Sequence, residues 1–389
     1  MKIAFLGNLP AATVLPEGAI RPSHRGVNHP APWVAALLPA LAKLTDYKLR
    51  VILPQRAVLK RTVVEHNGVE YEGLPMQFTE RWNPQTFYAV RSIAAHRALK
   101  QYKPDLIHAY GMETGNATVA LRTGLPVSCF IQGIIQRYFP YIEFTGKYRR
   151  RFQRRIEHSA VKKLRWLVAE TEFAKEWVRE NNPDAHVQII PHPTRRDFFD
   201  KGVANGSKHV VSIGGIDNRK AMDIAVRAFK HIRDQDARLT IVGGGGGLQE
   251  LRNLVEREGL SSRIELTGAL PTEKVIEKLK SASIFTITSR MDTSPNVLSE
   301  AHALGLPVIG TRSGGIPEMI DDGVDGYLID VDDVQALANR IDSLCVNPEL
   351  GRKMGQVGRE KVKILNDPDV IAKSHVDFFE HIRRDLGVR

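Results

Sequence analysis

Cysteine and long apolar runs are both scarce in this chain of 389 residues. Two cysteines, Cys129 and Cys345, are too few for a disulfide framework or a cysteine metal cluster, which indicates a reducing compartment. No stretch approaches the about 18 uncharged apolar residues of a membrane-spanning helix, and the first residues lack the apolar length of a signal peptide. We therefore expect a cytoplasmic protein without a membrane span or a secretory leader.

The composition that remains is typical of a globular protein, with 42% hydrophobic and 25% charged residues. A length of 389 residues exceeds what one hydrophobic core usually supports. Strand-like apolar runs alternate with helix-like stretches, and the alternation begins again after a Gly- and Asn-containing segment near residue 205. The pattern predicts an α/β protein with two Rossmann-like, doubly wound domains, at 1–203 and 204–365, and a C-terminal helix at 366–389 that packs back toward the first.

Positive charge is concentrated in the first half of the chain. Residues 1–200 hold 29 Lys and Arg against 17 Asp and Glu, or +12, and the remaining 26 and 27 give −1 of the net +11. Much of the excess lies in residues 147–165, where nine basic residues accompany one acid, Glu157.

Residues 147–165 allow three interpretations. Phe152, Ile156, Val161, Leu164 and Trp166 can form the apolar stripe of a basic amphipathic helix, which would suit an anionic membrane surface on the inner face or an anionic acceptor. A solvated helix that packs this stripe on its own domain fits equally well. A nucleic-acid contact is the weakest interpretation, because aromatics for base stacking are few and no recognition motif is present. We expect no nucleic-acid partner.

Glycine-rich turns follow several expected strands of the second half. Open α/β sheets bind ligands beyond the carboxyl ends of their strands, so these turns are candidates for a site. Gly243 begins a run of five glycines that lets a backbone approach an anion, although a flexible turn explains it as well. Gly214 and Gly215 precede Arg219 and Lys220, and this combination suits a diphosphate or simply an exposed basic helix start.

Two further turns complete the set. Gly314 and Gly315, followed by Pro317, form a third strand-to-helix turn. The fourth turn places two carboxylates eight positions apart: Asp292 in the loop, and Glu300 about one turn into the next helix.

These residues carry a resemblance to a known family. Residues 292–330, DTSPNVLSEAHALGLPVIGTRSGGIPEMIDDGVDGYLID, resemble the donor-site signature of retaining glycosyltransferases of family 4, which have the GT-B fold. The match extends through nearly all of residues 208–345 and is weaker in the first half. The resemblance implies two Rossmann-like domains facing across a cleft, and transfer of a hexose-type sugar from a UDP- or GDP-sugar to a glycan, lipid-linked or small-molecule acceptor, as in polysaccharide biosynthesis.

The resemblance also implies roles for individual residues. Glu300 matches the glutamate that holds the ribose hydroxyls, and Asp292 matches the one that faces the donor sugar and favours positive charge at the anomeric carbon. Lys220 matches the basic residue on the diphosphate, where a helix N-terminus assists without a metal. The remaining donor-binding positions are Gly214, Gly215, Arg219, Gly243, Ser294, Pro295, Asn296, Val297 and Leu298. No cofactor is expected beyond the nucleotide-sugar substrate.

Three positions depart from the family pattern. Gly215 stands where an arginine is usual, so one charge on the diphosphate is missing unless Arg219 or another arginine replaces it. Asp292 is shorter than the usual glutamate by one methylene group. Gln132 stands where many members have a histidine, and an amide can bond a hydroxyl but cannot shuttle a proton.

Acceptor-side residues are expected in the first domain. His108 is placed at a strand end where the family often has a histidine, so it is a catalytic candidate, although a strand-end histidine is more often structural. His24 and Arg25, in the long loop after the first strand, are acceptor candidates together with Gln132. His192 is expected near the boundary between the domains.

Other protein classes remain open. A nucleotide-sugar epimerase or a phosphorylase-like enzyme can share the two-domain architecture. A noncatalytic sugar-nucleotide-binding protein is compatible with the departures at Gly215 and Gln132. A dinucleotide-dependent dehydrogenase is disfavoured, because none of the glycine turns carries the full fingerprint with its ribose-binding acid.

Overall fold

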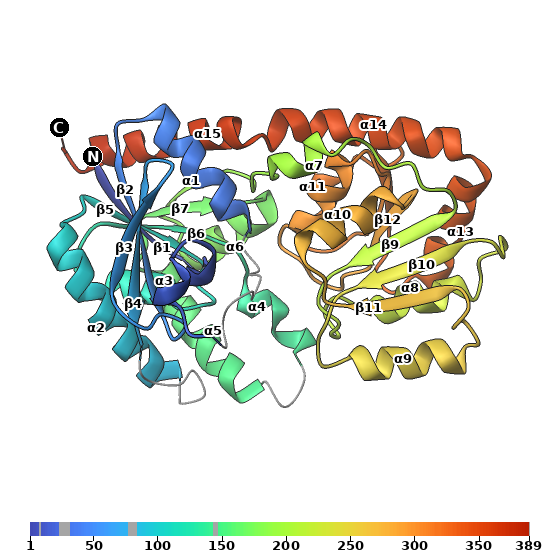
Figure 1. Cartoon of the computed structure of the whole chain (residues 1–389), viewed down its shortest axis with the longest axis horizontal. Helices are drawn as coiled ribbons and strands as arrows, with labels where there is room; N and C mark the ends of the chain where they lie inside the picture. Colours follow the sequence, from blue (N-terminus) through green and yellow to red (C-terminus); the bar gives the residue numbers. More distant parts are fainter. Residues whose placement is uncertain (8, 23–31, 77–83, 143–146, 389) are drawn as a thin grey trace. The chain divides into compact units, whose positions relative to one another are not determined.

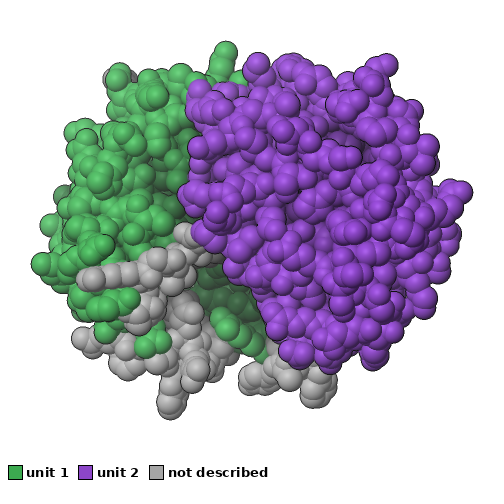
Figure 2. Space-filling model, turned by 45° about the vertical axis from the view of Figure 1, so that its right-hand side comes forward, with its two compact units in different colours: residues 1–139, 144–193, 368–389 green, residues 140–143, 194–367 purple. Residues whose placement is uncertain are grey.

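The computed structural model describes residues 1–388 except 8, 23–31, 77–83 and 143–146 (Figure 1). Unit 1 comprises residues 1–139, 144–193 and 368–389, and unit 2 comprises residues 140–143 and 194–367 (Figure 2).

The sheet of unit 1 has eight strands in the order β3-β4-β2-β1-β5-β6-β7-β8. All neighbours are parallel except β3 and β4. The strands are β1 (Lys2–Leu6), β2 (Lys48–Gln55), β3 (Thr62–His66), β4 (Val69–Pro75), β5 (Leu106–Tyr110), β6 (Val127–Phe130), β7 (Trp166–Ala169) and β8 (His186–Ile189). The central strands are buried throughout, as expected of a parallel sheet covered on both faces.

Helices complete unit 1: α1 (Pro32–Leu44), α2 (Pro84–Tyr102), α3 (Asn116–Leu121), α4 (Ile135–Tyr138), α5 (Lys147–Val161), α6 (Glu172–Asn181) and α15 (Pro368–Asp385). The last helix, α15, packs against α1 and inserts Ile371, Phe378, Phe379 and Ile382 into the hydrophobic core. In Figure 1 it runs beside α1, although more than three hundred residues separate the two.

Unit 2 has a six-stranded, fully parallel sheet in the order β11-β10-β9-β12-β13-β14. Its strands are β9 (His209–Ile213), β10 (Arg238–Val242), β11 (Ile264–Gly268), β12 (Ile284–Ile287), β13 (Val308–Thr311) and β14 (Gly326–Ile329). Its helices are α7 (Arg196–Asp200), α8 (Met222–Phe229), α9 (Leu248–Arg257), α10 (Thr272–Lys280), α11 (Asn296–Ala303), α12 (Ile316–Met319), α13 (Val334–Val346) and α14 (Pro348–Leu365). The predicted α/β class with two Rossmann-like units is confirmed.

The strand order of unit 2 changes direction at β9. The chain moves from β9 outward to β10 and β11, and then returns to β12 on the other side of β9. The carboxyl ends of β9 and β12 are therefore neighbours at the switch point, which is where open α/β sheets bind ligands.

The unit boundaries differ from those expected at 203/204 and 365/366. The chain passes from unit 1 to unit 2 at Pro193/Thr194 and returns at Asp367/Pro368. Phe198 is buried in the core of unit 2, and Ala204 donates a hydrogen bond to the Leu304 carbonyl, so the expected linker is part of unit 2.

Helix α5 ends at Val161, before the last two residues of the expected apolar stripe. Trp166 begins β7 instead of continuing the helix. The buried face of α5 includes Gln153 and Glu157, whereas Phe152 and Ile156 are only half-buried. Val161, Leu164 and Trp166 are buried as expected, but the inward face of the helix itself is not a continuous apolar stripe, because two polar residues with specific partners take inward positions. Within the described ranges, no helix has both the length and the apolar character needed to cross a bilayer.

Candidate functional site

Four loops converge at the carboxyl edge of the unit 2 sheet. Backbone hydrogen bonds join them across large sequence distances: Gly214 N–H to Val242 O at 3.0 Å, Ile216 N–H to Gly244 O at 2.9 Å, Arg290 N–H to Arg219 O at 2.8 Å, and Gly315 N–H to Asp292 O at 2.9 Å. The three glycine turns and the Asp292 loop predicted from the sequence are thus parts of one bonded framework.

Two glycines are required by this framework. A Cβ atom on Gly243 would lie 1.8 Å from the Gly214 carbonyl oxygen, and one on Gly314 would lie 1.9 Å from the Asp292 carbonyl oxygen. Gly314 also has φ +57°, in the left-handed region that favours glycine. These glycines let neighbouring loops touch, so they have a structural role whether or not they also approach a ligand.

Asp292 lies at the centre of the framework with its side chain only 10% exposed. Its Oδ2 atom forms an ion pair with Lys220 Nζ, lies 3.5 Å from Arg219 Nη1 and accepts a hydrogen bond from Ser289 Oγ at 3.4 Å. Burial opposes ionisation of this carboxyl, but the nearby charges of Lys220 and Arg219 outweigh burial and hold the pKa of Asp292 below its ordinary value.

The main chain around Lys220 is held firmly. Its N–H donates to Asp217 Oδ1 at 2.8 Å, and Thr288 Oγ1 donates to the next carbonyl, that of Ala221, at 2.8 Å. Ala221 has φ +49°, which is unusual for a residue with a Cβ atom and is maintained by these contacts. Arg219 donates from Nη1 to the Met291 carbonyl at 3.1 Å. Both cations are thereby directed to the carboxylate that the sequence singled out.

Position 215, where the family usually has an arginine, contributes no charged side chain to this site, because the residue is glycine. The nearest atoms to a Cβ built on Gly215 are 3.8 Å and 4.0 Å away, so a side chain would fit there and the sequence does not supply one. Arg219 lies instead beside Lys220, on the same Asp292 oxygen. That Arg219 replaces the missing arginine remains a prediction.

Helix α11 begins at Asn296, directly after the loop that carries Asp292. Its N-cap residue, Pro295, makes no side-chain cap hydrogen bond. The N-terminus of a helix carries a partial positive charge that suits an anionic ligand. Ser294 and Asn296 are half-buried, whereas Leu298 is fully buried in the core. The Leu298 side chain therefore supports the helix, and its expected ligand contact is not supported by its position.

Glu300 occupies the second turn of α11, as expected. Burial raises the pKa of Glu300 to about 7; Arg195 opposes this effect and Asp197 adds to it. Arg195 is itself paired with Asp197. The two carboxylates of the sequence motif thus differ: Asp292 is held ionised by two cations, whereas Glu300 is partly protonated at neutral pH.

A cavity of about 450 Å³ adjoins the loop that carries Lys220. It is lined in part by Asp217, Asn218 and Arg290. Arg290 Nη1 donates to the Asn218 carbonyl at 2.8 Å and its Nε donates to Asp332. The cavity thus shares its wall with the loop but does not contain Lys220.

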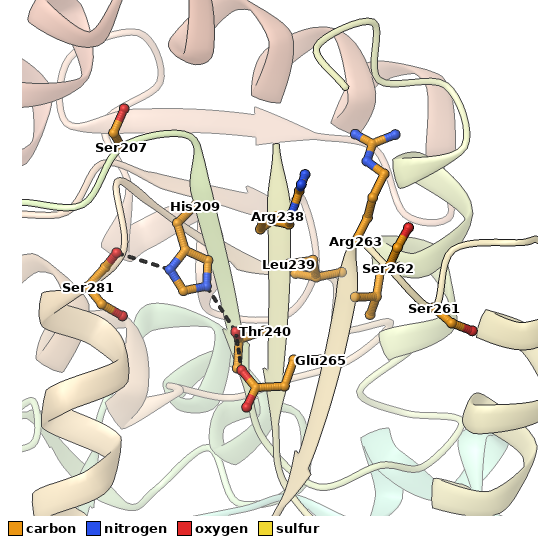
Figure 3. A pocket seen from close by; sticks show the side chains of 11 residues that line it. Ser207, His209, Arg238, Leu239, Thr240, Ser261, Ser262, Arg263, Glu265 and Ser281 are labelled. Carbon is orange, nitrogen blue, oxygen red and sulfur yellow. Dashed lines mark hydrogen bonds between the residues drawn. The ribbon is translucent and has the colours of Figure 1, made fainter. Parts of the chain in front are cut away.

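A second cavity of about 470 Å³ lies at the opposite edge of the sheet, where β9, β10 and β11 begin (Figure 3). His209 Nε2 lies 2.9 Å from Thr240 Oγ1, which donates to Glu265 Oε2 at 3.0 Å. Arg263 donates from three nitrogens to main-chain carbonyls. Because this cavity lies at the amino ends of the strands, and open α/β sheets bind ligands beyond the carboxyl ends, it is not the candidate site.

In unit 1, Gln132 lies two residues beyond the end of β6. A Cβ atom on Gly111 would lie 2.8 Å from Gln132 Oε1 and 2.5 Å from Glu113 Oε1, so these two side chains converge over Gly111. Burial raises the pKa of Glu113 to about 7. Glu113 was missed in the sequence, although an acid three residues after the strand β5 was a usable signal.

His108 was predicted to lie at a strand end, and this is wrong. It occupies the middle of β5, is fully buried, and contacts Ser128 Oγ through Nδ1 at 2.8 Å. Phe379 of α15 packs edge-on against its ring. Burial lowers the pKa of His108 well below its ordinary value, so the ring is neutral. These contacts describe a core residue and do not support a catalytic role.

The other first-domain candidates have mixed outcomes. His24 and Arg25 lie outside the described residues. His192 lies in unit 1, next to the boundary at Pro193, with Nε2 2.8 Å from Glu170 Oε1. Burial lowers its pKa to about 3. Among the described residues, no three His, Cys, Asp or Glu side chains gather as a group that could hold a metal ion.

Comparison with known proteins covers both units. The Glycosyl transferase 4-like domain matches residues 30–193, and Glycosyl transferases group 1 matches residues 193–361. N-acetyl-alpha-D-glucosaminyl L-malate synthase of Bacillus anthracis is 31% identical over 186 residues, which are 47% of this chain and 48% of that protein. A GDP-mannose-dependent alpha-(1-6)-phosphatidylinositol monomannoside mannosyltransferase of Mycolicibacterium smegmatis is 31% identical over 182 residues, 44% of this chain and 48% of that protein. The chain thus spans about half the length of the curated relatives it matches.

Solved structures show the same fold over almost the whole chain. Sucrose-phosphate synthase from Thermosynechococcus elongatus has a TM-score of 0.82 at 19% identity, covering 99% of this chain and 100% of that one. HepE of Anabaena in complex with UDP-glucose has a TM-score of 0.74 at 16% identity, covering 98% of this chain and 100% of that one. These structures show the fold, which is GT-B. The two family matches meet at residue 193 and together cover residues 30–361, and they place the chain in the family 4 type of glycosyltransferases.

Proposed function

We propose that the protein is a retaining glycosyltransferase that moves a hexose-type sugar from a UDP- or GDP-sugar to a glycan, lipid-linked or small-molecule acceptor. The observation that carries this proposal is the pair of cations, Lys220 and Arg219, directed to one buried carboxylate beside the N-terminus of α11. One relative is named for its use of GDP-mannose, and HepE was solved with UDP-glucose; both donor types therefore stay open here.

The chemistry follows from where charge develops. As the bond between the anomeric carbon and the diphosphate oxygen breaks, the leaving nucleoside diphosphate gains negative charge, which Lys220, Arg219 and the α11 N-terminus stabilise. The Asp292 carboxylate favours the positive charge on the sugar. The acceptor oxygen bonds to the anomeric carbon on the face that the phosphate leaves, and its proton passes to a phosphate oxygen. No protein base is required, which agrees with the buried position of His108.

Glu300 is assigned to the ribose of the donor. A carboxylate accepts hydrogen bonds from both vicinal hydroxyls, whereas a protonated carboxyl has one acceptor position fewer. Its position in the second turn of α11, with burial raising its pKa to about 7, supports recognition that strengthens as the group ionises.

The acceptor is assigned to unit 1 with less detail. Gln132 is proposed to bond an acceptor hydroxyl, and His24 and Arg25 keep their assignment as acceptor candidates. Helix α5 exposes a row of basic side chains, namely Arg149, Arg150, Arg151, Arg154 and Arg155. We propose that this row contacts an anionic membrane surface on the cytoplasmic side, where a lipid-linked acceptor would be located.

A donor screen tests the function. The protein is incubated with UDP- and GDP-sugars, with and without acceptor extracts, and free nucleotide is measured. We expect release from one donor class and a large loss of release in Lys220→Ala and Glu300→Ala. No turnover with any donor would contradict the enzyme assignment, and unchanged rates in both variants would remove these residues from the site.

A noncatalytic sugar-nucleotide-binding protein is the second candidate, because Gly215 and Gln132 replace the usual arginine and histidine. The same donor screen distinguishes this candidate from an enzyme, because a noncatalytic protein binds a nucleoside diphosphate but releases no nucleotide from any sugar donor.

A further inference from the structure

The cations that the donor needs are already occupied. Lys220 and Arg219 both contact Asp292 Oδ2, and the three side chains are only 13%, 24% and 10% exposed, respectively. Ser289 Oγ donates to the same oxygen. The inference below rests on the proposed function, in which these two cations stabilise the donor diphosphate.

A diphosphate and the Asp292 carboxylate must compete for these cations. If both were to contact Lys220 Nζ, their negative charges would be close neighbours at a semi-buried site, where the repulsion between like charges is only weakly screened. One ammonium and one guanidinium cannot fully offset a carboxylate together with a diphosphate of two or three charges. The binding of a diphosphate therefore weakens the contacts of Asp292.

When a diphosphate replaces Asp292 as the partner of the cations, the framework of hydrogen-bonded loops allows only the ends of the side chains to move. The Asp292 main chain is fixed by the hydrogen bond from Gly315 N–H and by the close contact with Gly314. The Lys220 main chain is fixed by Asp217 and by Thr288, whose Oγ1 also donates to the Lys220 carbonyl at 3.2 Å. The flexible four-carbon stem of lysine can move its ammonium group while the loops stay in place.

We propose that Asp292 is an internal counter-anion, which holds Lys220 and Arg219 in the empty site, yields them to the donor diphosphate, and takes them back when the nucleoside diphosphate leaves. Asp292 is thus a positioning residue for the cations in addition to its contact with the sugar. Two consequences follow. The carboxylate is released at the stage when positive charge develops on the sugar, so that the charge of the sugar replaces the two cations in favouring its ionised form. Product release is assisted, because a charge within the protein replaces the departing phosphate.

Asp292→Asn tests the proposal, since asparagine keeps the shape and an acceptor oxygen for Lys220 but removes the charge. Binding of UDP, GDP, UMP and GMP is measured by calorimetry on the full chain. We expect the preferred nucleoside diphosphate to bind about tenfold or more tightly to the variant, with the matching monophosphate changed by less than about twofold. A residue that only contacts the sugar would leave diphosphate affinity unchanged. Unchanged or weaker binding of the diphosphate overturns the inference.

Two matched variants sharpen the result. Ser289→Ala removes a neutral neighbour of the same carboxylate oxygen and should change diphosphate affinity by less than about twofold. In a Lys220→Met background, Asp292→Asn should increase the affinity for the nucleoside diphosphate much less, because the ammonium group that Asp292→Asn would release is absent. An equal increase in diphosphate affinity in the wild-type and Lys220→Met backgrounds would contradict the proposal that the diphosphate takes Lys220 from Asp292.

A measurement on the wild type keeps the proposal testable if Asp292→Asn does not fold. The ammonium resonance of Lys220, assigned by comparison with Lys220→Arg, should shift on addition of the diphosphate and not of the monophosphate; no shift with bound diphosphate overturns the exchange. Failure of the proposed function looks different: the wild type would then bind neither UDP nor GDP, or it would bind one of them and release no nucleotide from any sugar donor.

Discussion

The Glu157 carboxylate of α5 accepts hydrogen bonds from the backbone N–H groups of Ile135 and Gln136, at 2.8 Å and 3.0 Å. The single acid of the basic segment thus fastens α5 to the first turn of α4. The arrangement explains why a helix with so many exposed arginines remains seated on unit 1, and it makes the attachment sensitive to pH.

Stability should fall as pH rises past the ordinary range of a carboxyl group. Burial raises the pKa of Glu157 from 4.5 to about 8, so between these values the unfolded chain releases a proton that the native state retains. The free energy of unfolding therefore decreases with rising pH across this window and levels off above pH about 8. Glu157→Gln should cost about 1–3 kcal/mol at pH 5 and show a shallower slope in denaturant titrations. Glu180→Gln, an exposed partner of Arg137, is the control, and an unaltered slope in Glu157→Gln would refute the assignment.

Lys220→Ala should lower nucleotide release from the donor by about 100-fold, because a preorganised charge on the leaving diphosphate is lost. The fold should remain intact by circular dichroism, since Arg219 still faces Asp292. Lys230→Ala is the matched control: Lys230 is exposed and pairs with Glu258 in the same unit. Equal rates for the two variants would show that position 220 has no special role.

Nucleotide affinity should rise with pH in a manner that depends on Glu300. With its pKa raised to about 7, Glu300 is largely protonated at pH 6 and largely ionised at pH 8, and only the ionised form accepts from both ribose hydroxyls. Calorimetry at pH 6, 7 and 8 is expected to show tighter binding at each step in the wild type. Glu300→Gln should keep only the part of the pH dependence that comes from the phosphates. If wild type and variant have parallel profiles, Glu300 does not bind the ribose.

Gly314→Ala should destabilise unit 2 more than Gly323→Ala. Both glycines have positive φ, but a Cβ atom at 314 would lie 1.9 Å from the Asp292 carbonyl, whereas nothing lies within 4 Å of one at 323. We expect a cost of about 1 kcal/mol at 323 from backbone strain and about 2–4 kcal/mol at 314, measured by urea unfolding. The difference between the two losses of unfolding free energy measures the cost of disturbing the contact between the two loops. Similar costs at both positions would mean that the loops separate easily.

Vesicle binding should depend on the exposed face of α5. Replacement of Arg151, Arg154 and Arg155 by glutamate should abolish salt-sensitive sedimentation with vesicles that contain phosphatidylglycerol. The control replaces Arg352, Lys353 and Lys363 of α14, which are also exposed and basic. If the wild type does not bind anionic vesicles, or if both triple variants lose binding equally, α5 is a solvated helix with no specific membrane role.

The alternation of apolar runs with helical stretches predicted both sheets, because buried parallel strands are continuous apolar segments that turn residues interrupt. The residues of the glycine turns, Lys220 and Asp292 were singled out for the same reason: they follow strands. Their pairing was not predicted. It depends on β12 lying beside β9, and a linear pattern does not contain the order of strands in a sheet.

The positions of several side chains of unit 1 were not predicted correctly, because they depend on contacts with segments that are distant in the sequence. His108 resembled a residue at a strand end, but β5 continues two residues further and α15, from the far end of the chain, covers the ring. Gln153 and Glu157 were not among the residues of the expected apolar stripe, yet they turn inward because backbone groups of other segments require partners. Glu113 carried no family signature, and its position three residues after β5 was the one usable signal; its side chain converges with that of Gln132 over Gly111 only in the fold.

The placement of α15 in the core of unit 1 has a consequence for the order of folding. Phe378 and Phe379 are fully buried there, and they are synthesised only after every residue of unit 2. Unit 1 therefore cannot complete its core until all of unit 2 has been synthesised. Although domains usually mature in the order of synthesis, here the first unit to begin is the last to finish, and its apolar surface requires protection until then.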